Sequence, residues 1–547
     1  MRRLLPLLFG VLAFAVSAVH AGRPSFWFDE LATVSATDRS FGEMMRMLAS
    51  VDSVHGLYYI VIRWWEALFG LGEWSLRLFS CLGVGAAVSA IVVLAKRLDA
   101  SLAVPAGVVA TVLPRVTWAG VEARSYAWVI AASALLLLCA VRAAERPCRR
   151  TWFAYGGAVA LSVALFLYSG AVVLAAFLTI VWGRHRLRRP ALIATGAGLL
   201  VISPLIVLSA TQTGQVNWLA WPGWMVFQNV FVDQWFDHSV TFAVAAWVLV
   251  CSALWVGRGT GGPWRTRAAL RGWVGRGSLG RWLAPEPWAE WAHVLRWAVP
   301  AALAPPILLL AVSTVFPMYV GRYVIASVPG VVLILAVAVR MVADRFGAHR
   351  SRAAVWAVLA ALTACAVPGY LWQRTPLSKP GGSDFSYAAR YIHDNARPGD
   401  CVLFQVQPSW STTTLRVALE GLPEQFAGLK DIGDDGDRRT DGRLWDKAKG
   451  VNQWPTWVAQ NCTAAWVLAD ADRTEDEWHR ENGNLYWTFR PFQFMGSDLQ
   501  MHLDDGGLAV VHQEQFHVLQ VVHLEAPPPA VGPDPQPLPH TRHWYWR

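Results

Sequence analysis

Long apolar runs separated by basic clusters dominate this chain of 547 residues. A helix needs about 20 residues to span the hydrocarbon of a bilayer, and eleven runs reach or approach that length. Charged residues make up only 16% of the chain, whereas soluble domains carry about 25%. We therefore expect an α-helical polytopic membrane protein with about eleven transmembrane helices: 4–21, 78–95, 101–119, 126–143, 151–168, 170–183, 191–209, 240–257, 297–314, 324–339 and 353–372.

The basic clusters predict how this bundle is oriented. With the N-terminus inside, 23 of the 31 Lys and Arg residues before residue 373 fall on one side of the membrane. The positive-inside rule assigns that side to the cytoplasm. This accounts for most of the net charge of +9 without a nucleic-acid partner. We expect a multi-pass plasma-membrane protein whose loop 22–77 and whose residues after 373 are extracytoplasmic, with membrane lipids around its spans.

The first apolar segment allows two interpretations. Arg2-Arg3, a leucine-rich run and the small residues 18–21 also fit a cleavable signal peptide. Cleavage would leave residue 22 outside, as an uncleaved helix also does. We favour the uncleaved helix, as a wall of the candidate site.

An acidic pair, Asp29-Glu30, follows this segment directly, and Asp52 and His55 follow about twenty residues later. Carboxylates are costly to keep ionised near hydrocarbon, so such a pair marks a candidate functional site. The capping box at 40–43 starts an amphipathic helix, and a second apolar helix covers about 57–69. We expect two surface helices that present Asp29-Glu30 on one side and Asp52 with His55 between them.

A second outer loop, about 210–238, combines tryptophans with acidic residues. Sugar-binding clefts use this combination, since a sugar ring stacks on an aromatic face and its hydroxyls need acceptors. Trp218, Trp221 and Asp233 are candidate acceptor-binding residues. The alternative is that the tryptophans belong to the interfacial aromatic belt.

The character of the chain changes near residue 376. Helix and strand patterns alternate from there, which predicts a transmembrane domain over 1–375, an extracytoplasmic α/β domain over 376–526 and a Pro-rich tail over 527–547. The expected elements are a helix at 385–395, a strand at 401–406, a helix and strand at 456–461 and 464–469, and a hairpin at 508–524. Cys401 and Cys462 are either a disulfide or two buried thiols. No catalytic motif appears in this region.

Four short motifs, in order and on the same expected side, resemble one known superfamily. They are Phe28-Asp29-Glu30, Asp52-x-x-His55, Glu122-x-Arg124-x-Tyr126 and Tyr319-x-x-Arg322-Tyr323. Together they resemble the protein O-mannosyltransferase superfamily, which are membrane glycosyltransferases of the GT-C class that use polyprenyl-phosphate sugars. The resemblance covers about residues 20–340. One departure is His55-Gly56-Leu57, where the family often has His-Pro-Pro.

The donor has a good leaving group, so the chemistry needs a base for the acceptor hydroxyl and positive charge for the phosphate. Asp29 is the expected base, although aspartate also caps helices. Glu30 is expected to hold Asp29 or a sugar hydroxyl, or else to be a solvated neighbour. Arg322 can form a bidentate pair with phosphate, with snorkelling or an acidic partner as its alternatives.

The remaining candidates for donor binding are weaker. Arg124 is a second phosphate ligand or pairs with Glu122, which the family motif places at the donor site together with Tyr323. His55 binds phosphate or sugar, or is structural, and Asp52 is its expected orienter. No cofactor and no metal site are predicted, although a carboxylate cluster of this kind can hold a divalent cation.

The composition and the outer α/β region resemble mycobacterial members that build lipoglycans. The resemblance implies inverting transfer of mannose from decaprenyl-phosphate mannose to a lipoarabinomannan-type acceptor. An arabinofuranosyltransferase that uses decaprenyl-phosphate arabinose is an alternative. A lipid-carrier flippase or a non-catalytic glycan-assembly partner is an alternative of another class. A flippase is disfavoured, since the charged candidates lie at the outer face and not at the membrane midplane.

Overall fold

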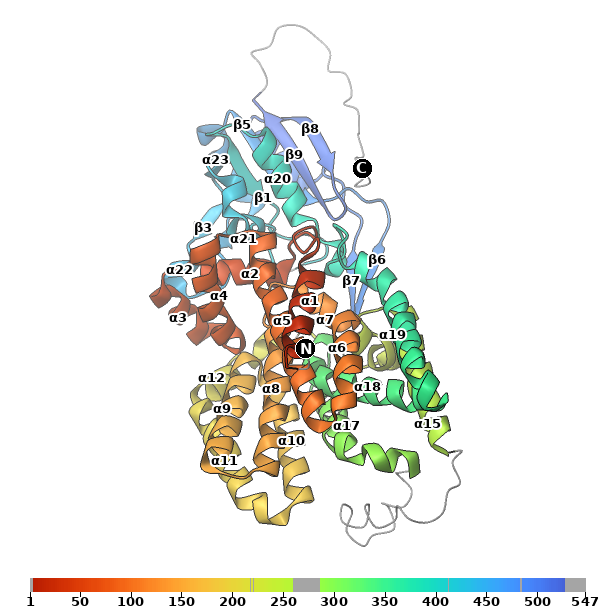
Figure 1. Cartoon of the computed structure of the whole chain (residues 1–547). Coiled ribbons are helices and arrows are strands. Elements are labelled where there is room, and N and C mark those ends of the chain that lie inside the picture. Colours follow the sequence, from red (N-terminus) through yellow and green to blue (C-terminus); the bar gives the residue numbers. More distant parts are fainter. Residues whose placement is uncertain are drawn as a thin grey trace.

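The computed structural model describes residues 3–526 except 217, 220, 259–285, 412, 483 and 484. The expected Pro-rich tail, 527–547, lies outside the described residues. A bundle of helices occupies most of the molecule, and a smaller region that contains the β-sheet caps one end of it (Figure 1).

Each of the eleven predicted runs coincides with a helix or with two helices joined at a bend. Five helices among the described residues are long and apolar enough to cross a membrane, or up to eight spans if each bent pair counts as one. This supports a multi-pass membrane protein, while the number eleven stays a prediction. The helices are α1 (Leu5–Ala18), α5 (Glu73–Leu98), α6 (Ala103–Val112), α7 (Pro114–Gly120), α8 (Tyr126–Glu145), α9 (Arg149–Leu165), α10 (Gly170–Gly183), α11 (Arg188–Val201), α12 (Ser203–Thr211), α15 (Val240–Arg258), α17 (Glu286–Val312), α18 (Val328–Asp344) and α19 (Gly347–Trp372).

Prolines lie at two of the bends. α6 and α7 meet at 57°, with Pro114 at the start of α7, and α11 and α12 meet at 56°, with Pro204 near the start of α12. Proline lacks an amide hydrogen and clashes with the preceding turn, so it begins a helix more easily than it continues one. After the short α7, the chain runs through residues 121–125 before α8, and this stretch carries Glu122 and Arg124.

Three α-helices, one more than expected, fill residues 22–77, the expected first outer loop: α2 (Phe28–Thr37), α3 (Phe41–Ser50) and α4 (Gly56–Phe69). α3 begins with the predicted capping box, in which the Glu43 amide donates to the Ser40 hydroxyl at 3.3 Å and the Ser40 amide to the Glu43 carboxylate at 2.7 Å. The expectation of two helices missed α2. Asp29 and Glu30 lie in its first turn, where carboxylates interact favourably with the helix dipole.

A mixed five-stranded sheet forms the centre of the C-terminal region, in the order β2-β1-β5-β9-β8. β1 is parallel to β2 and β5, whereas β9 is antiparallel to both β5 and β8. A disulfide joins Cys401 in β1 to Cys462 just before β5. The strands are β1 (Cys401–Phe404), β2 (Lys430–Asp431), β3 (Asp434–Gly436), β4 (Lys447–Ala448), β5 (Ala464–Asp470), β6 (Glu477–Asn482), β7 (Leu485–Phe489), β8 (Ala509–Gln515) and β9 (Leu519–Glu525), and the helices include α20 (Phe385–Asn395), α21 (Val417–Gly421), α22 (Arg438–Asp441), α23 (Trp454–Asn461) and α24 (Asp498–Asp505).

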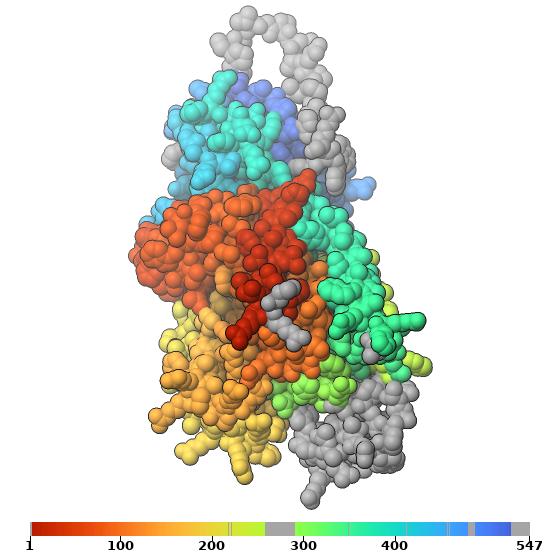
Figure 2. All heavy atoms as spheres, viewed as in Figure 1, coloured from red at the N-terminus to blue at the C-terminus, as the bar shows by residue number. Residues whose placement is uncertain are grey.

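The first outer loop and the C-terminal region share one hydrophobic core. Leu31 and Val34 of α2 and Met44 of α3 are fully buried in the same cluster as Phe385 of α20 and Leu468 of β5. In space-filling form, the loop is a band between the membrane helices and the C-terminal region (Figure 2). The loop that carries Asp29 is therefore held from both sides.

Candidate functional site

The two adjacent carboxylates at the start of α2 have different surroundings. Asp29 is partly exposed, whereas Glu30 is fully buried. Glu30 accepts two hydrogen bonds from the Arg77 guanidinium of α5, at 2.8 and 2.6 Å, and a third from the Ala123 amide at 2.8 Å. This corrects the expectation that Glu30 holds Asp29 or a sugar hydroxyl, because its oxygens are occupied by Arg77, Ala123 and Lys379, and it therefore anchors α2.

Lys379 lies between two buried carboxylates. Its ammonium is 2.7 Å from Glu122 and 3.3 Å from Glu30, and it also donates to the Val121 carbonyl. Glu122 accepts a further hydrogen bond, at 2.6 Å, from the indole of Trp27, which directly precedes α2. Glu122 therefore joins three segments of the chain, and neither of its expected roles, as a donor ligand or as the partner of Arg124, matches these contacts.

The pKa values of Glu30 and Glu122 are shifted in opposite directions. Burial alone disfavours the charged form of Glu30, but Arg77 and Lys379 outweigh it and hold the pKa of Glu30 below its ordinary value. Burial raises the pKa of Glu122 to about 7, with Lys379 opposing the shift. Both effects follow from a low-dielectric site in which each charge depends on its partner.

Arg124 begins a chain of hydrogen bonds into the first outer loop. Its guanidinium donates to the Tyr59 hydroxyl at 2.6 Å, and that hydroxyl donates to Asp52 at 2.8 Å. Asp52 thus orients Tyr59, which corrects its expected role as the orienter of His55. In the part of the chain that the structure describes, Arg124 forms no ion pair with a carboxylate, and its guanidinium also donates to the Thr33 hydroxyl at 3.5 Å.

Arg322 is buried among aromatic rings at the junction before α18. Its guanidinium lies 5.5 Å from the ring centre of Trp27 and 5.6 Å from those of Trp218 and Tyr323. Tyr323 in turn stacks on Tyr168 at 5.0 Å. Because Trp27 precedes Asp29 by two residues, this packing places Arg322 beside the start of α2.

The charged candidates lie around the start of α2. The Arg322 guanidinium packs against Trp27, which precedes Asp29 by two residues. The Arg124 guanidinium donates to the Thr33 hydroxyl at 3.5 Å, one helical turn after Asp29. One carboxylate and two guanidinium groups from three separate segments are therefore brought to the start of α2.

His55 is buried next to this cluster. Its ring lies 5.9 Å from that of Tyr59, and among the described residues its Nδ1 atom has no hydrogen-bond partner. Burial, reinforced by the nearby charge of Arg124, holds the pKa of His55 well below its ordinary value. The neutral ring can donate or accept one hydrogen bond to a ligand. The chain has Gly56 where related sequences often have proline after the histidine, and α4 nevertheless begins at Gly56.

The three candidates for acceptor binding, Trp218, Trp221 and Asp233, lie in different surroundings. Trp218 is half exposed and contacts Arg322, so it lies at the edge of the cluster. Asp233 is fully buried and pairs with His238 at 2.9 Å, which corrects its expected place in an open sugar cleft. Trp221 is 56% exposed, so its ring is accessible to a ligand, and its role in acceptor binding stays a prediction.

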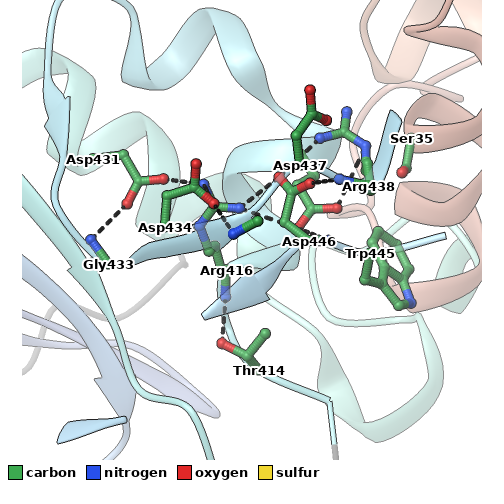
Figure 3. A network of polar contacts seen from close by, with 12 residues as sticks. Ser35, Thr414, Arg416, Asp431, Gly433, Asp434, Asp437, Arg438, Trp445 and Asp446 are labelled. Atoms are coloured by element: carbon green, nitrogen blue, oxygen red, sulfur yellow. Dashed lines mark hydrogen bonds and ion pairs between the residues drawn. The ribbon is translucent and has the colours of Figure 1, made fainter. Parts of the chain in front are cut away.

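A second polar network holds the other end of α2 against the C-terminal region (Figure 3). The Ser35 hydroxyl donates to the Leu444 carbonyl at 2.6 Å, and Asp38 pairs with Arg438 at 3.1 Å. Arg438 also pairs with Asp446 at 3.1 Å, and Arg416 pairs with the same carboxylate at 2.5 Å. The network fixes the direction of α2, and with it the position of Asp29.

Sequence reasoning missed Lys379, Arg77, Tyr59 and Trp27. Arg77 and Lys379 lie far along the chain from the carboxylates that they bind, and neither belongs to one of the four motifs. One signal in the sequence could have indicated them. Both are basic residues at the expected outer end of an apolar run, and the positive-inside rule makes basic residues unusual there.

The comparisons with known proteins concern the fold and part of the membrane region. A family model described as dolichyl-phosphate-mannose-protein mannosyltransferase matches residues 56–208. The structure is similar to that of ArnT from Cupriavidus metallidurans in the apo state, with 17% identity, a TM-score of 0.54, and coverage of 94% of this chain and 97% of that one. The chain has the fold of ArnT.

ArnT bound to undecaprenyl phosphate is similar to the same extent, with 16% identity, a TM-score of 0.53 and the same coverage of both chains. No curated protein sequence matches the chain. These likenesses confirm the general fold class, an α-helical membrane protein of GT-C type. The family match covers part of the membrane region, and the activity, the sugar and the acceptor stay predictions.

Proposed function

We propose that this protein is a membrane glycosyltransferase that transfers a sugar from a polyprenyl phosphate to an acceptor on the outer face of the membrane. The observation that carries the proposal is the position of Asp29 in α2 between Trp27, which Arg322 contacts, and Thr33, which Arg124 contacts. A carboxylate can accept the proton of an attacking hydroxyl, and two guanidinium groups suit a departing phosphate. The family match and the likeness to ArnT bound to undecaprenyl phosphate support the same substrate class.

The proposed reaction is a direct displacement. The acceptor oxygen forms a bond to the anomeric carbon as the bond from that carbon to the phosphate oxygen breaks, and the hydroxyl proton passes to Asp29. The polyprenyl phosphate leaves with its negative charge stabilised by Arg124 and Arg322. A single displacement inverts the anomeric centre, so a β-linked phospho-mannose donor gives an α-mannoside.

Our specific proposal is transfer of mannose from decaprenyl-phosphate mannose to a lipoglycan acceptor of the lipoarabinomannan type. The resemblance of the composition and of the outer α/β region to mycobacterial members that build lipoglycans favours it over other polyprenyl-linked sugars. Arabinofuranosyl transfer from decaprenyl-phosphate arabinose uses the same carboxylate and guanidinium groups, so it is the second candidate.

The test is transfer of radiolabelled mannose from decaprenyl-phosphate mannose to a lipoglycan acceptor by the purified chain and by Asp29→Asn. We expect the parent to be active and the variant to lose at least about a hundredfold in rate, as for removal of a general base. Glu73→Gln is a matched control at the outer end of α5, and it should keep parental activity. Equal rates for the parent and Asp29→Asn would remove Asp29 from the proposed role, and transfer from the arabinose donor alone would select the second candidate.

A further inference from the structure

A second cavity lies in the C-terminal region, apart from the cluster around Asp29. Its volume is about 370 Å³, and it is open at the end of the sheet where the first residue of β5, Ala464, pairs with the last residue of β9, Glu525. Figure 1 shows this end of β9 on the side of the sheet remote from the membrane helices. The volume is at the lower end of the range for small-molecule sites, about 300–1,000 Å³.

Aromatic rings form one part of the lining. Trp466 of β5 stacks on His523 of β9 with their planes 11° apart and their centres 4.2 Å apart. Tyr391 of α20 lies across from them and is roughly parallel to His512 of β8, at 6.4 Å. Tyr391 and His523 are partly exposed, so the cavity presents flat ring surfaces to a ligand.

Polar groups form the rest of the lining. The Asp400 carboxylate is held in place by the Trp466 indole at 3.0 Å and by the Arg397 amide at 2.9 Å. The Glu525 carboxylate is about half exposed. Asn395 at the end of α20 adds an amide. Fixed carboxylate and amide groups are acceptors and donors for hydroxyl groups, and they are positioned before a ligand arrives.

The charges distinguish between ligand classes. The lining holds two carboxylates, Asp400 and Glu525, and one guanidinium, that of Arg397. This balance disfavours phosphate. Among the described residues, no group of three or more His, Cys, Asp or Glu side chains could hold a metal ion.

We infer that this cavity binds one or two sugar residues of a neutral oligosaccharide, through stacking on the ring faces and hydrogen bonds from its hydroxyls to Asp400 and Glu525. The site is separate from the proposed catalytic cluster, since none of its lining residues contributes to that cluster. The inference goes beyond the proposed function and does not rest on it.

The test is saturation-transfer difference NMR of the full chain in nanodiscs with two probes, an α-linked mannotriose and an α-linked arabinofuranosyl trisaccharide. We expect one of these probes to bind, and Tyr391→Ala to weaken its binding by about tenfold, as expected for loss of an aromatic contact. Glu525→Gln should also weaken it. Tyr387→Ala, on the same helix but outside the cavity, and Asp505→Asn, an exposed carboxylate on α24, are the matched controls and should bind as the parent does.

Asp29→Asn separates this inference from the proposed function, since it should abolish transfer and leave the trisaccharide signals unchanged. The thermal unfolding midpoint of each variant shows whether it is folded. Absence of binding by both probes would overturn the inference. So would parental binding in folded Tyr391→Ala and Glu525→Gln together, or displacement of the trisaccharide by inorganic phosphate at low millimolar concentration.

Discussion

At the scale of residues, the neighbouring carboxylates Asp29 and Glu30 have different surroundings. Glu30 belongs to a buried group of two acidic and two basic side chains with Glu122, Arg77 and Lys379. Asp29, one residue earlier, stays partly exposed beside the two guanidinium groups. A buried group of paired charges keeps its geometry, because any change leaves an uncompensated charge in a low-dielectric site.

We predict that Lys379→Met lowers the free energy of unfolding by about 3–5 kcal/mol, as for loss of one partner of a buried pair. Lys379→Met combined with Glu122→Gln should recover much of this loss, since the double variant has a neutral group and Gln can still accept from the Trp27 indole. Chemical denaturation of the three proteins in detergent measures both effects. Lys430→Met, an exposed lysine on β2, should have no effect. A double variant less stable than Lys379→Met would contradict the charge argument.

A second residue-level prediction concerns pH. Burial raises the pKa of Glu420 to about 8 against the opposing charge of Arg438, whereas its ordinary value is 4.5. Between these pH values the folded protein holds a proton that the unfolded chain releases, so the contribution of this group to stability is complete below about pH 4.5 and is lost as the pH rises through 8.

The expected result is that parental stability falls more steeply between pH 5 and 9 than that of Glu420→Gln. Unfolding midpoints across this range measure the difference. Glu424→Gln, an exposed neighbour in the chain, should follow the parent, and parallel curves for all three proteins would show that Glu420 does not hold the proton.

Sequence reasoning reached some of these residues and could not reach others. Asp29, Arg124 and Arg322 lie in short motifs at the outer ends of apolar runs, so their common side could be predicted, and the structure brings them together. It could not be predicted that Glu30 faces inward while Asp29 does not, because this depends on Arg77 and Lys379, whose positions are set by tertiary packing.

At the scale of elements, α2 is held in place along its whole length by contacts with other segments of the chain. Its first turn is held by Arg77 and Lys379, its last residues by the network of Arg438 (Figure 3), and its middle by close packing. A Cβ atom added at Gly421 of α21 would lie 2.3 Å from the Leu31 side chain of α2. The helix pair therefore depends on a residue without a side chain at that contact.

We predict that Gly421→Ala displaces α2, lowers the free energy of unfolding by about 1–3 kcal/mol, as for overpacking in a core, and reduces transfer. Steady-state kinetics and thermal unfolding of the purified chain measure the two effects. Gly42→Ala in α3, where an added Cβ meets nothing within 4 Å, is the control and should keep both properties. Unchanged kinetics in Gly421→Ala would show that the position of α2 tolerates this shift.

The elements were easier to predict than their contacts. Apolar length indicated every helix of the bundle, and alternating patterns indicated α20, β1, β5 and the β8–β9 hairpin. The pattern gave no sign that β5 and β9 would be neighbours in one mixed sheet, since that pairing joins residues about 50 to 60 positions apart. α2 was missed because its ten residues are mostly small and polar, without a strong apolar stripe.

At the scale of the whole molecule, the positive-inside pattern predicts which side of the membrane each region faces. Cys148 is an exposed free cysteine between α8 and α9, beside basic residues that the positive-inside rule places in the cytoplasm. Asp505 is exposed on α24 in the C-terminal region. The two positions should lie on opposite sides of the membrane.

We predict that a membrane-impermeant maleimide applied to intact cells labels an Asp505→Cys variant and leaves Cys148 unlabelled until the cells are permeabilised. Cys251→Ser in the same background removes the other exposed thiol. Mass spectrometry of tryptic peptides identifies the labelled site. Labelling of Cys148 in intact cells would reverse the proposed orientation and move the candidate site to the cytoplasm.

The shared hydrophobic core also sets an order of events during synthesis. The loop that carries Asp29 leaves the ribosome early, whereas its packing partners in α20 and β5 come more than 300 residues later. At about 5–20 residues per second, this delay is roughly 15 to 60 s. During that time, Leu31, Val34 and Met44 lack their packing partners in the C-terminal region. We therefore expect that a chain released before its last strands has no organised candidate site.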